Sequence, residues 1–179
     1  MIDQRIDERL KAAVRDVPDF PKPGIIFKDI TPILKDPGLC EAVVECMAKT
    51  IDPDTVDVIA GVESRGFLFG LTLAQQLRKP FVPVRKVGKL PYDTVQQEYA
   101  LEYGQAIIEI HADAFAVGSR VLIHDDLLAT GGTVAATSRL IQRLGGSIAG
   151  YAFIISLDFL NGKERLAAFS PRIHSLVGY

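Results

Sequence analysis

The amino-acid sequence predicts an α/β fold in which an open parallel β-sheet is flanked by helices and carries an antiparallel hairpin. Short apolar segments alternate with helical ones from residue 56 to residue 156, the order that is typical of a parallel sheet covered on both faces. The segments between them contain few residues, as such connections usually do. With 179 residues, 48% of them hydrophobic, the chain can bury one core without disulfides. We therefore expect a single domain over residues 1–179.

The N-terminal part is predicted to contain two helices separated by an irregular segment. Residues 1–15 distribute isoleucine and leucine among charged residues, which predicts an amphipathic helix and not a secretion signal. Residues 17–24 contain three prolines and are expected to lack regular structure. The second helix is expected from Pro37 to about Thr50, because proline suits a first helical position.

The alternating elements follow. Strands are predicted at residues 56–60, 81–84, 120–124 and 148–156, the last being the final strand, and helices at 66–78 and 132–144. Residues 85–111 break this order, because they have no helical periodicity. Within them, residues 95–101 and 106–110 have the pattern of two antiparallel strands that project from the sheet as a hairpin. We call residues 85–111 the hood, since an excursion of this length often forms a lid.

Composition and charge exclude several classes of function. The chain has 20 basic and 22 acidic residues without a block of like charge, so no nucleic-acid partner is expected. No apolar run approaches the length of about 20 residues that a membrane helix needs. Cys40 and Cys46 would point in different directions on one helix, and the three histidines share no ligand spacing with them. We expect a cytoplasmic protein that binds small molecules.

The most informative segment is VLIHDDLLATGGT at residues 121–133. It places a buried strand before two acids, a turn of small and hydroxylated residues, and the start of a helix. Parallel sheets bind ligands at the carboxyl ends of their strands, and a helix N-terminus attracts anions. A phosphate is therefore predicted to bind to a phosphate loop that consists of Ala129, Thr130, Gly131, Gly132 and Thr133.

The acid pair, Asp125 and Asp126, would repel a phosphate unless a cation or a hydroxylated group lay between them. A ribose diol with Mg²⁺ nearby resolves this conflict, which indicates a sugar phosphate as ligand. The alternative interpretation is a helix-capping loop with incidental acids.

Four motifs together resemble the type I phosphoribosyltransferases, in particular their adenine-specific branch. They are DFPKPG at 19–24, GVESRGF at 61–67, LEYG at 101–104 and the acid pair with its loop. The resemblance implies an open α/β fold with a flexible hood, a base-binding segment within residues 1–35, and a homodimer. It also implies adenine and phosphoribosyl pyrophosphate as substrates, AMP and pyrophosphate as products, and Mg²⁺ as cofactor.

Residue roles follow from the same resemblance. The phosphate loop matches the 5-phosphate site and the acid pair matches the acids that face the ribose hydroxyls, with Mg²⁺ carried by the substrate near Asp125 and Asp126 and no dedicated metal site on the protein. A cis peptide between Glu63 and Ser64 is common in the family. The implied pyrophosphate contacts are Glu63, Ser64, Arg65, Arg85 and Lys86, and the implied adenine contacts are Ile26, Phe27 and Lys28. By pattern alone, Arg65 is equally compatible with a surface ion pair and Phe27 with a core position.

The implied catalytic residues are Glu102, Tyr103, Arg65 and Lys86. Enzymes for 6-oxopurines commonly place an acid where this chain has Ala129, so the acid that acts at N7 of the base must come from elsewhere. Glu102 in the hood matches the family's catalytic carboxylate, with Tyr103 beside it. Two alternatives stay open: a phosphoribosyltransferase for another base, and a sensor that binds phosphoribosyl pyrophosphate without catalysis.

Overall fold

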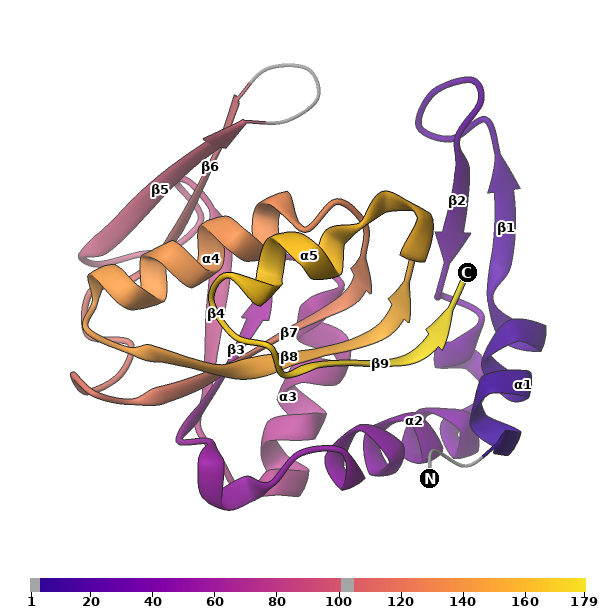
Figure 1. The fold of residues 1–179 in the computed structure, drawn as a ribbon, viewed down its shortest axis with the longest axis horizontal. Coiled ribbons are helices and arrows are strands. Elements are labelled where there is room, and N and C mark those ends of the chain that lie inside the picture. The colour runs from indigo at the N-terminus through magenta and orange to yellow at the C-terminus, as the bar shows by residue number, and fades with distance from the viewer. Residues whose placement is uncertain (1–3, 101–104) are drawn as a thin grey trace.

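The computed structural model describes residues 4–100 and 105–179. They form a seven-stranded sheet of order β5-β6-β4-β3-β7-β8-β9 and a separate two-stranded hairpin (Figure 1). The five parallel strands are β4 (Phe81–Lys86), β3 (Val58–Val62), β7 (Arg120–Leu128), β8 (Ser147–Ser156) and β9 (Ile173–Gly178). The predicted fold class is confirmed.

Helices cover both faces of the sheet (Figure 1). On one face lie α1 (Gln4–Ala13), α2 (Pro37–Lys49) and α3 (Gly66–Leu77), and on the other lie α4 (Gly132–Arg143) and α5 (Gly162–Ala167). Single 3-10 turns occur at η1 (Ile33–Lys35), η2 (Pro53–Thr55) and η3 (Asp158–Leu160). Strand residues alternate between the two apolar clusters, since Ile59 belongs to the first and its neighbours Val58 and Ala60 to the second.

The hood joins the edge of the sheet. Its strands β5 (Thr94–Ala100) and β6 (Gln105–His111) pair antiparallel, and β6 pairs antiparallel with β4. Glu109 anchors this junction: it is 2% exposed and accepts hydrogen bonds from the backbone N–H groups of Lys89 at 2.9 Å and Leu90 at 2.8 Å. Burial opposes its ionisation, but these donors outweigh burial and lower the pKa of Glu109. The predicted hairpin is therefore confirmed, and it extends the sheet.

Two predictions about secondary structure are wrong in part. The irregular segment predicted at residues 17–24 is confirmed for residues 19–24 but not for Val17 and Pro18, which belong to β1 (Arg15–Pro18) and pair antiparallel with β2 (Ile26–Asp29). Pro18 is tolerated because it ends a strand of a two-stranded ribbon, where a missing N–H removes little pairing. The strand at 148–156 is not the last one, because α5 and β9 follow it and β9 pairs with β8.

Strand β7 is longer than predicted, and this affects the site. It continues through Leu128, so Asp125 and Asp126 lie within the strand and not after its end. The long partner β8 sustains the pairing, from Arg120 opposite Ser147 to Leu128 opposite Ser156. Strand β4 likewise continues to Lys86, which places Arg85 and Lys86 on the sheet.

Candidate active site

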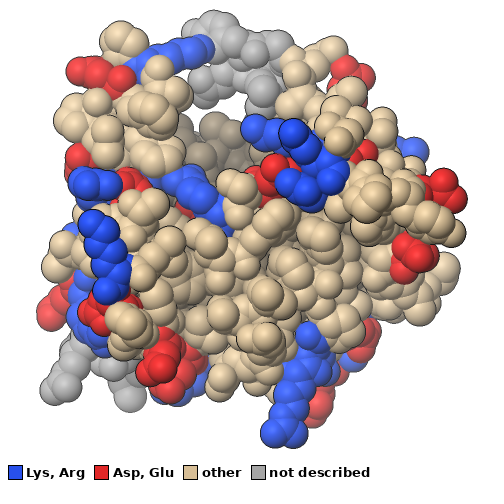
Figure 2. Space-filling view, turned by 180° about the vertical axis from the view of Figure 1, so that it is seen from behind, with Lys and Arg blue, Asp and Glu red and all other residues tan. Residues whose placement is uncertain are grey.

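A cavity of about 670 Å³ lies beside the phosphate loop, at the carboxyl end of β7. The hairpin β1–β2 and the hood rise on either side of this edge of the sheet (Figure 1). Figure 2 shows the surface hollowed between these two projections, with basic side chains at the rim. The cavity is lined by Pro21, Lys22, Ile25, Tyr99, Ala100, Ala129, Thr130, Gly132, Thr133, Leu160 and Arg165.

The phosphate loop connects β7 directly to the N-terminus of α4. Gly131 has a φ of 74° and no described side chain caps the helix, so its first N–H groups are available to an anion. A Cβ atom at Gly131 would lie 3.1 Å from the carbonyl oxygen of Gly162, so a larger residue would push the two backbone segments apart. Thr133 Oγ1 donates a hydrogen bond to the hydroxyl of Tyr99 at 3.1 Å. The loop therefore contacts the hood through Tyr99, a residue that the sequence motifs did not indicate.

The acid pair is withdrawn from solvent. Asp126 is 2% exposed and Asp125 is partly buried. Burial raises the pKa of both carboxyl groups, and for Asp125 the neighbouring charge of Asp126 raises it further. The guanidinium of Arg65 opposes these effects, with Nε 3.1 Å from Asp126 Oδ2. An ionised pair is thus unfavourable in the free protein, and a hydroxylated or cationic ligand would stabilise it.

Arg65 brings three parts of the predicted site together. It follows the turn between β3 and α3, in which the Glu63–Ser64 peptide bond is cis, as the resemblance implied. Its guanidinium carbon lies 4.7 Å from the ring centroid of Phe27 on β2, a cation–π distance. A Cβ atom at Gly66 would lie 3.0 Å from Asp125 Oδ1, so glycine lets the start of α3 approach the acid pair. Segments assigned to adenine, pyrophosphate and ribose are therefore in contact.

Known proteins resemble this chain over most of its length. The family model described as "Phosphoribosyl transferase domain" matches residues 30–166. A curated relative, the adenine phosphoribosyltransferase of Cytophaga hutchinsonii, is 54% identical over 97% of this chain and 96% of its own length. The chain belongs to the adenine phosphoribosyltransferase family.

Solved structures of family members share the fold. The adenine phosphoribosyltransferase of Thermoanaerobacter pseudethanolicus superimposes with a TM-score of 0.92 at 49% identity, and the match covers 96% of this chain and 99% of that chain. The Saccharomyces cerevisiae enzyme was solved with D-2,5-dideoxy-2,5-imino-altritol 1,6-bisphosphate and adenine. Its TM-score is 0.91 at 39% identity, with 97% of this chain and 99% of that chain covered.

Three of the residues predicted to contact pyrophosphate, Glu63, Arg85 and Lys86, lie at the ends of the neighbouring strands β3 and β4. The carboxylate of Glu63 accepts hydrogen bonds from Arg85 Nε at 3.2 Å, from Arg85 Nη2 at 3.3 Å and from the backbone N–H of Lys86 at 2.9 Å. Burial disfavours its ionisation, but the donors on β4 outweigh burial and lower the pKa of Glu63. Its side chain therefore holds Arg85 in place. The side chains of Ser64 and Lys86 are exposed.

The predicted adenine segment, residues 26–28, lies on β2, directly after Ile25 in the cavity wall. Phe20 packs edge-on against the Phe27 ring at a centroid distance of 5.1 Å. The Phe27 ring therefore contacts both an aromatic ring and the guanidinium of Arg65. Lys28 Nζ lies 2.6 Å from Asp16 Oδ1 and 3.8 Å from the ring centroid of Tyr179. Its side chain is thus held by groups of the protein itself. Glu102 and Tyr103 lie outside the described residues, and their roles stay predictions.

Proposed function

We propose that the chain transfers the 5-phosphoribosyl group of phosphoribosyl pyrophosphate to adenine, forming AMP and pyrophosphate in purine salvage. The observation that carries this proposal is the contact of Arg65 with both Asp126 and Phe27, next to the phosphate loop. The curated relative at 54% identity is an adenine phosphoribosyltransferase, and the yeast structure contains adenine. Both support the assignment of the base.

The sugar phosphate is proposed to bind along the end of β7. The N–H groups of the phosphate loop and its threonine hydroxyls receive the 5-phosphate at the N-terminus of α4. Asp125 and Asp126 accept hydrogen bonds from the ribose hydroxyls. Because burial raises the pKa of both carboxyl groups, ribose binding would favour their ionised form, and they would in turn fix C1 of the sugar for attack.

Pyrophosphate is proposed to leave toward Arg65, Ser64 and Lys86. Displacement at C1 passes through a transition state with oxocarbenium character, so charge stabilisation on the leaving group matters most. Arg65 supplies a fork of N–H donors, of which Nη1 is buried without a hydrogen-bond partner among the described residues. The Glu63 carboxylate keeps Arg85 beside this route.

Mg²⁺ is proposed to arrive with phosphoribosyl pyrophosphate. Among residues 4–100 and 105–179, no group of three or more His, Cys, Asp and Glu side chains could hold a metal ion. The nearest carboxylates to the sugar would be Asp125 and Asp126, whose oxygens suit a hard cation that the substrate also ligates. When bound, Mg²⁺ supplies positive charge to the pyrophosphate oxygens.

The base is proposed to stack on Phe27 with its edge read by the backbone of the adenine segment. In nucleotide formation N9 of adenine attacks C1 while proton or charge is transferred toward N7. Ala129 cannot serve as an acid there, so we assign this role to Glu102, with Tyr103 beside it and the closed hood excluding water.

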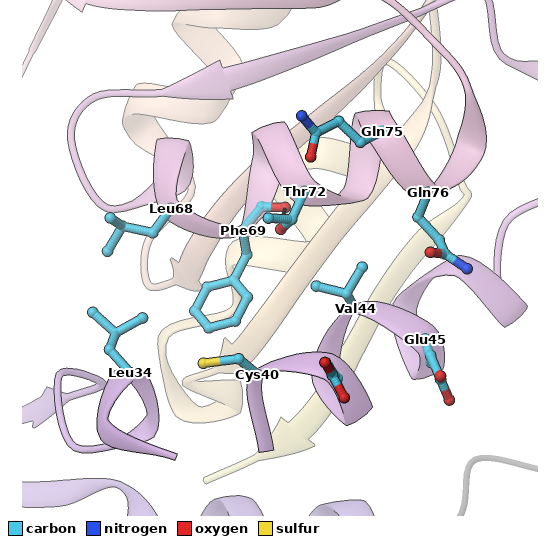
Figure 3. Close-up of a pocket in the computed structure, with 10 residues that line it drawn as sticks. Leu34, Cys40, Val44, Glu45, Leu68, Phe69, Thr72, Gln75 and Gln76 are labelled. Atoms are coloured by element: carbon cyan, nitrogen blue, oxygen red, sulfur yellow. Dashed lines mark hydrogen bonds between the residues drawn. The ribbon is translucent and has the colours of Figure 1, made fainter. Parts of the chain in front are cut away.

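A homodimer is proposed through the exposed apolar face of α3. Leu68 and Leu71 are 45% and 47% exposed and, three residues apart, share one helix face. Together with Leu34 on η1, Leu68 flanks a cavity of about 610 Å³ between α2 and α3 (Figure 3). This face begins directly after the Arg65 turn, so a second copy bound there would border the site.

Sedimentation velocity tests the dimer. The apparent mass from sedimentation should be about twice the 19.5 kDa of one chain. Leu68→Glu should lower it to the mass of the monomer, because a charge would be buried in an apolar interface. Val117→Glu is the matched control, since Val117 is 84% exposed in the loop before β7, beside Gly145. A wild-type monomer, or a dimer that survives Leu68→Glu, would contradict the proposal.

The cytoplasm is proposed as the location. Neither Cys40 nor Cys46 forms a disulfide within the described residues, which suits a reducing compartment. Within the described residues, the helices are too short or too polar to cross a membrane.

The activity is tested by steady-state assays with phosphoribosyl pyrophosphate and Mg²⁺, in which adenine, hypoxanthine, guanine, xanthine and orotate are offered separately. Nucleotide formation with adenine alone is expected. Nucleotide formation with another base would refute the proposed specificity for adenine. Binding of phosphoribosyl pyrophosphate without turnover on any base would favour the alternative of a non-catalytic sensor.

A further inference from the structure

Helix α5 is packed directly against the phosphate loop. The carbonyl oxygen of Gly162 lies 3.1 Å from the position of a Cβ atom at Gly131, and a Cβ atom at Gly162 would overlap the carbonyl oxygen of Ala129. Gly162 and Leu166 are buried, and Leu166 is 0% exposed. Because the backbone of α5 packs against the backbone of the phosphate loop, side chains that project from α5 are held at a fixed position relative to the loop.

Arg165 extends from this helix into the cavity beside the loop. Its Nη1 atom lies 3.3 Å from the position of a Cβ atom at Gly132, the first residue of α4, and it lines the cavity with Thr130 and Thr133. Arg165 makes no hydrogen bond or ion pair with any residue that the structure describes. The other basic residue of α5, Lys163, is paired with Asp158 at 2.8 Å.

The charges around the loop show what Arg165 would bind. The loop residues themselves are neutral, and the acid pair next to them is negative when ionised. A phosphate monoester carries close to two negative charges at neutral pH and needs compensation beyond the helix dipole. A guanidinium presents two parallel N–H donors that match two phosphate oxygens, and it stays charged at any physiological pH.

We propose that Arg165 binds the 5-phosphate of phosphoribosyl pyrophosphate together with the phosphate loop. This inference rests on the proposed function, because the anion at the loop is taken to be the 5-phosphate. Arg165 is then a substrate-binding residue that neither the loop motif nor the acid pair contains.

Removing the side chain should weaken substrate binding without changing the chemistry. Arg165→Ala should raise the KM for phosphoribosyl pyrophosphate about 10–100-fold, the range of a lost hydrogen bond to a charged group. The kcat and the KM for adenine should stay close to wild type, because a remote phosphate is held equally in the ground and transition states. Arg165→Lys should give a KM for phosphoribosyl pyrophosphate between those of the wild type and Arg165→Ala, since lysine keeps the charge but lacks the paired N–H donors of the guanidinium. Lys163→Ala is the matched control and should change neither constant.

Binding of the two halves of the substrate separates this role from a general effect. By calorimetry, Arg165→Ala should weaken ribose 5-phosphate binding about 10-fold or more and leave pyrophosphate binding unchanged. Equal losses for both ligands, unchanged ribose 5-phosphate binding, or a comparable effect of Lys163→Ala would each overturn the inference. A wild-type chain that binds ribose 5-phosphate but makes no AMP would refute the proposed activity alone, because the Arg165 comparison can still be measured.

Discussion

Substitution of Gly131 tests whether the shape of the phosphate loop holds the substrate. Its φ of 74° lies in the left-handed region, where a residue with a Cβ atom loses about 1–2 kcal/mol. The new methyl group would also lie 3.1 Å from the carbonyl oxygen of Gly162, and overpacking of this kind adds at least about 1 kcal/mol. Gly131→Ala should therefore lower the free energy of unfolding by about 2–4 kcal/mol.

Gly118→Ala separates the two contributions. Gly118 has a similar φ of 86° but no atom within 4 Å of the added carbon, so only the backbone conformation is penalised, by about 1–2 kcal/mol. Urea unfolding would measure both variants, and steady-state kinetics would measure the KM for phosphoribosyl pyrophosphate. We expect that KM to rise about 10-fold or more for Gly131→Ala, because the loop must move away from α5. Equal unfolding free energies and an unchanged KM in both variants would refute the reasoning.

Two further predictions concern the acids of the site. Glu102→Gln should lower kcat about 10²–10⁴-fold while phosphoribosyl pyrophosphate still binds; stopped-flow kinetics with calorimetry would check this, and an undiminished rate would remove Glu102 from its role. Asp125→Asn should raise the melting temperature of the ligand-free protein at neutral pH while AMP formation falls. The folded state raises the pKa of Asp125, so its ionisation destabilises the fold increasingly as the pH rises from about 4 toward the folded pKa, and fully above it. The variant keeps the Oδ1 acceptor for the Asp126 N–H. Thermal melts across this pH range should show that its melting temperature depends less on pH than that of the wild type. A lower melting temperature than wild type at neutral pH would contradict the argument.

The phosphate loop could be predicted because its information is local. Strand, acids, turn and helix follow one another within residues 121–133, and the structure places the loop at the start of α4. The end of β7 could not be predicted, since the polar residues from His124 to Asp126 interrupt the apolar pattern. Pairing with β8 carries the strand onward, and His124 is accommodated as a neutral residue whose pKa burial lowers to about 4.

Contacts between residues that are far apart in the sequence could not be predicted from local sequence patterns. The approach of Arg65 to Phe27 depends on how β2 is placed beside the turn before α3, which no spacing in the sequence encodes. Helix α5 has six residues, too few for a periodic pattern, so Arg165 had no signal that related it to the loop. Strand β9 contains histidine and serine and is only partly buried over its first half, so its sequence lacks the apolar pattern that would predict a strand after residue 156.

The central claim is tested most directly by phosphorus NMR of the reaction itself. With Mg²⁺, phosphoribosyl pyrophosphate and adenine, the wild-type chain should produce AMP and pyrophosphate in equal amounts as the substrate signals disappear. Without adenine the substrate should persist. Consumption of phosphoribosyl pyrophosphate in the absence of a base, or no AMP in the presence of adenine, would contradict the account.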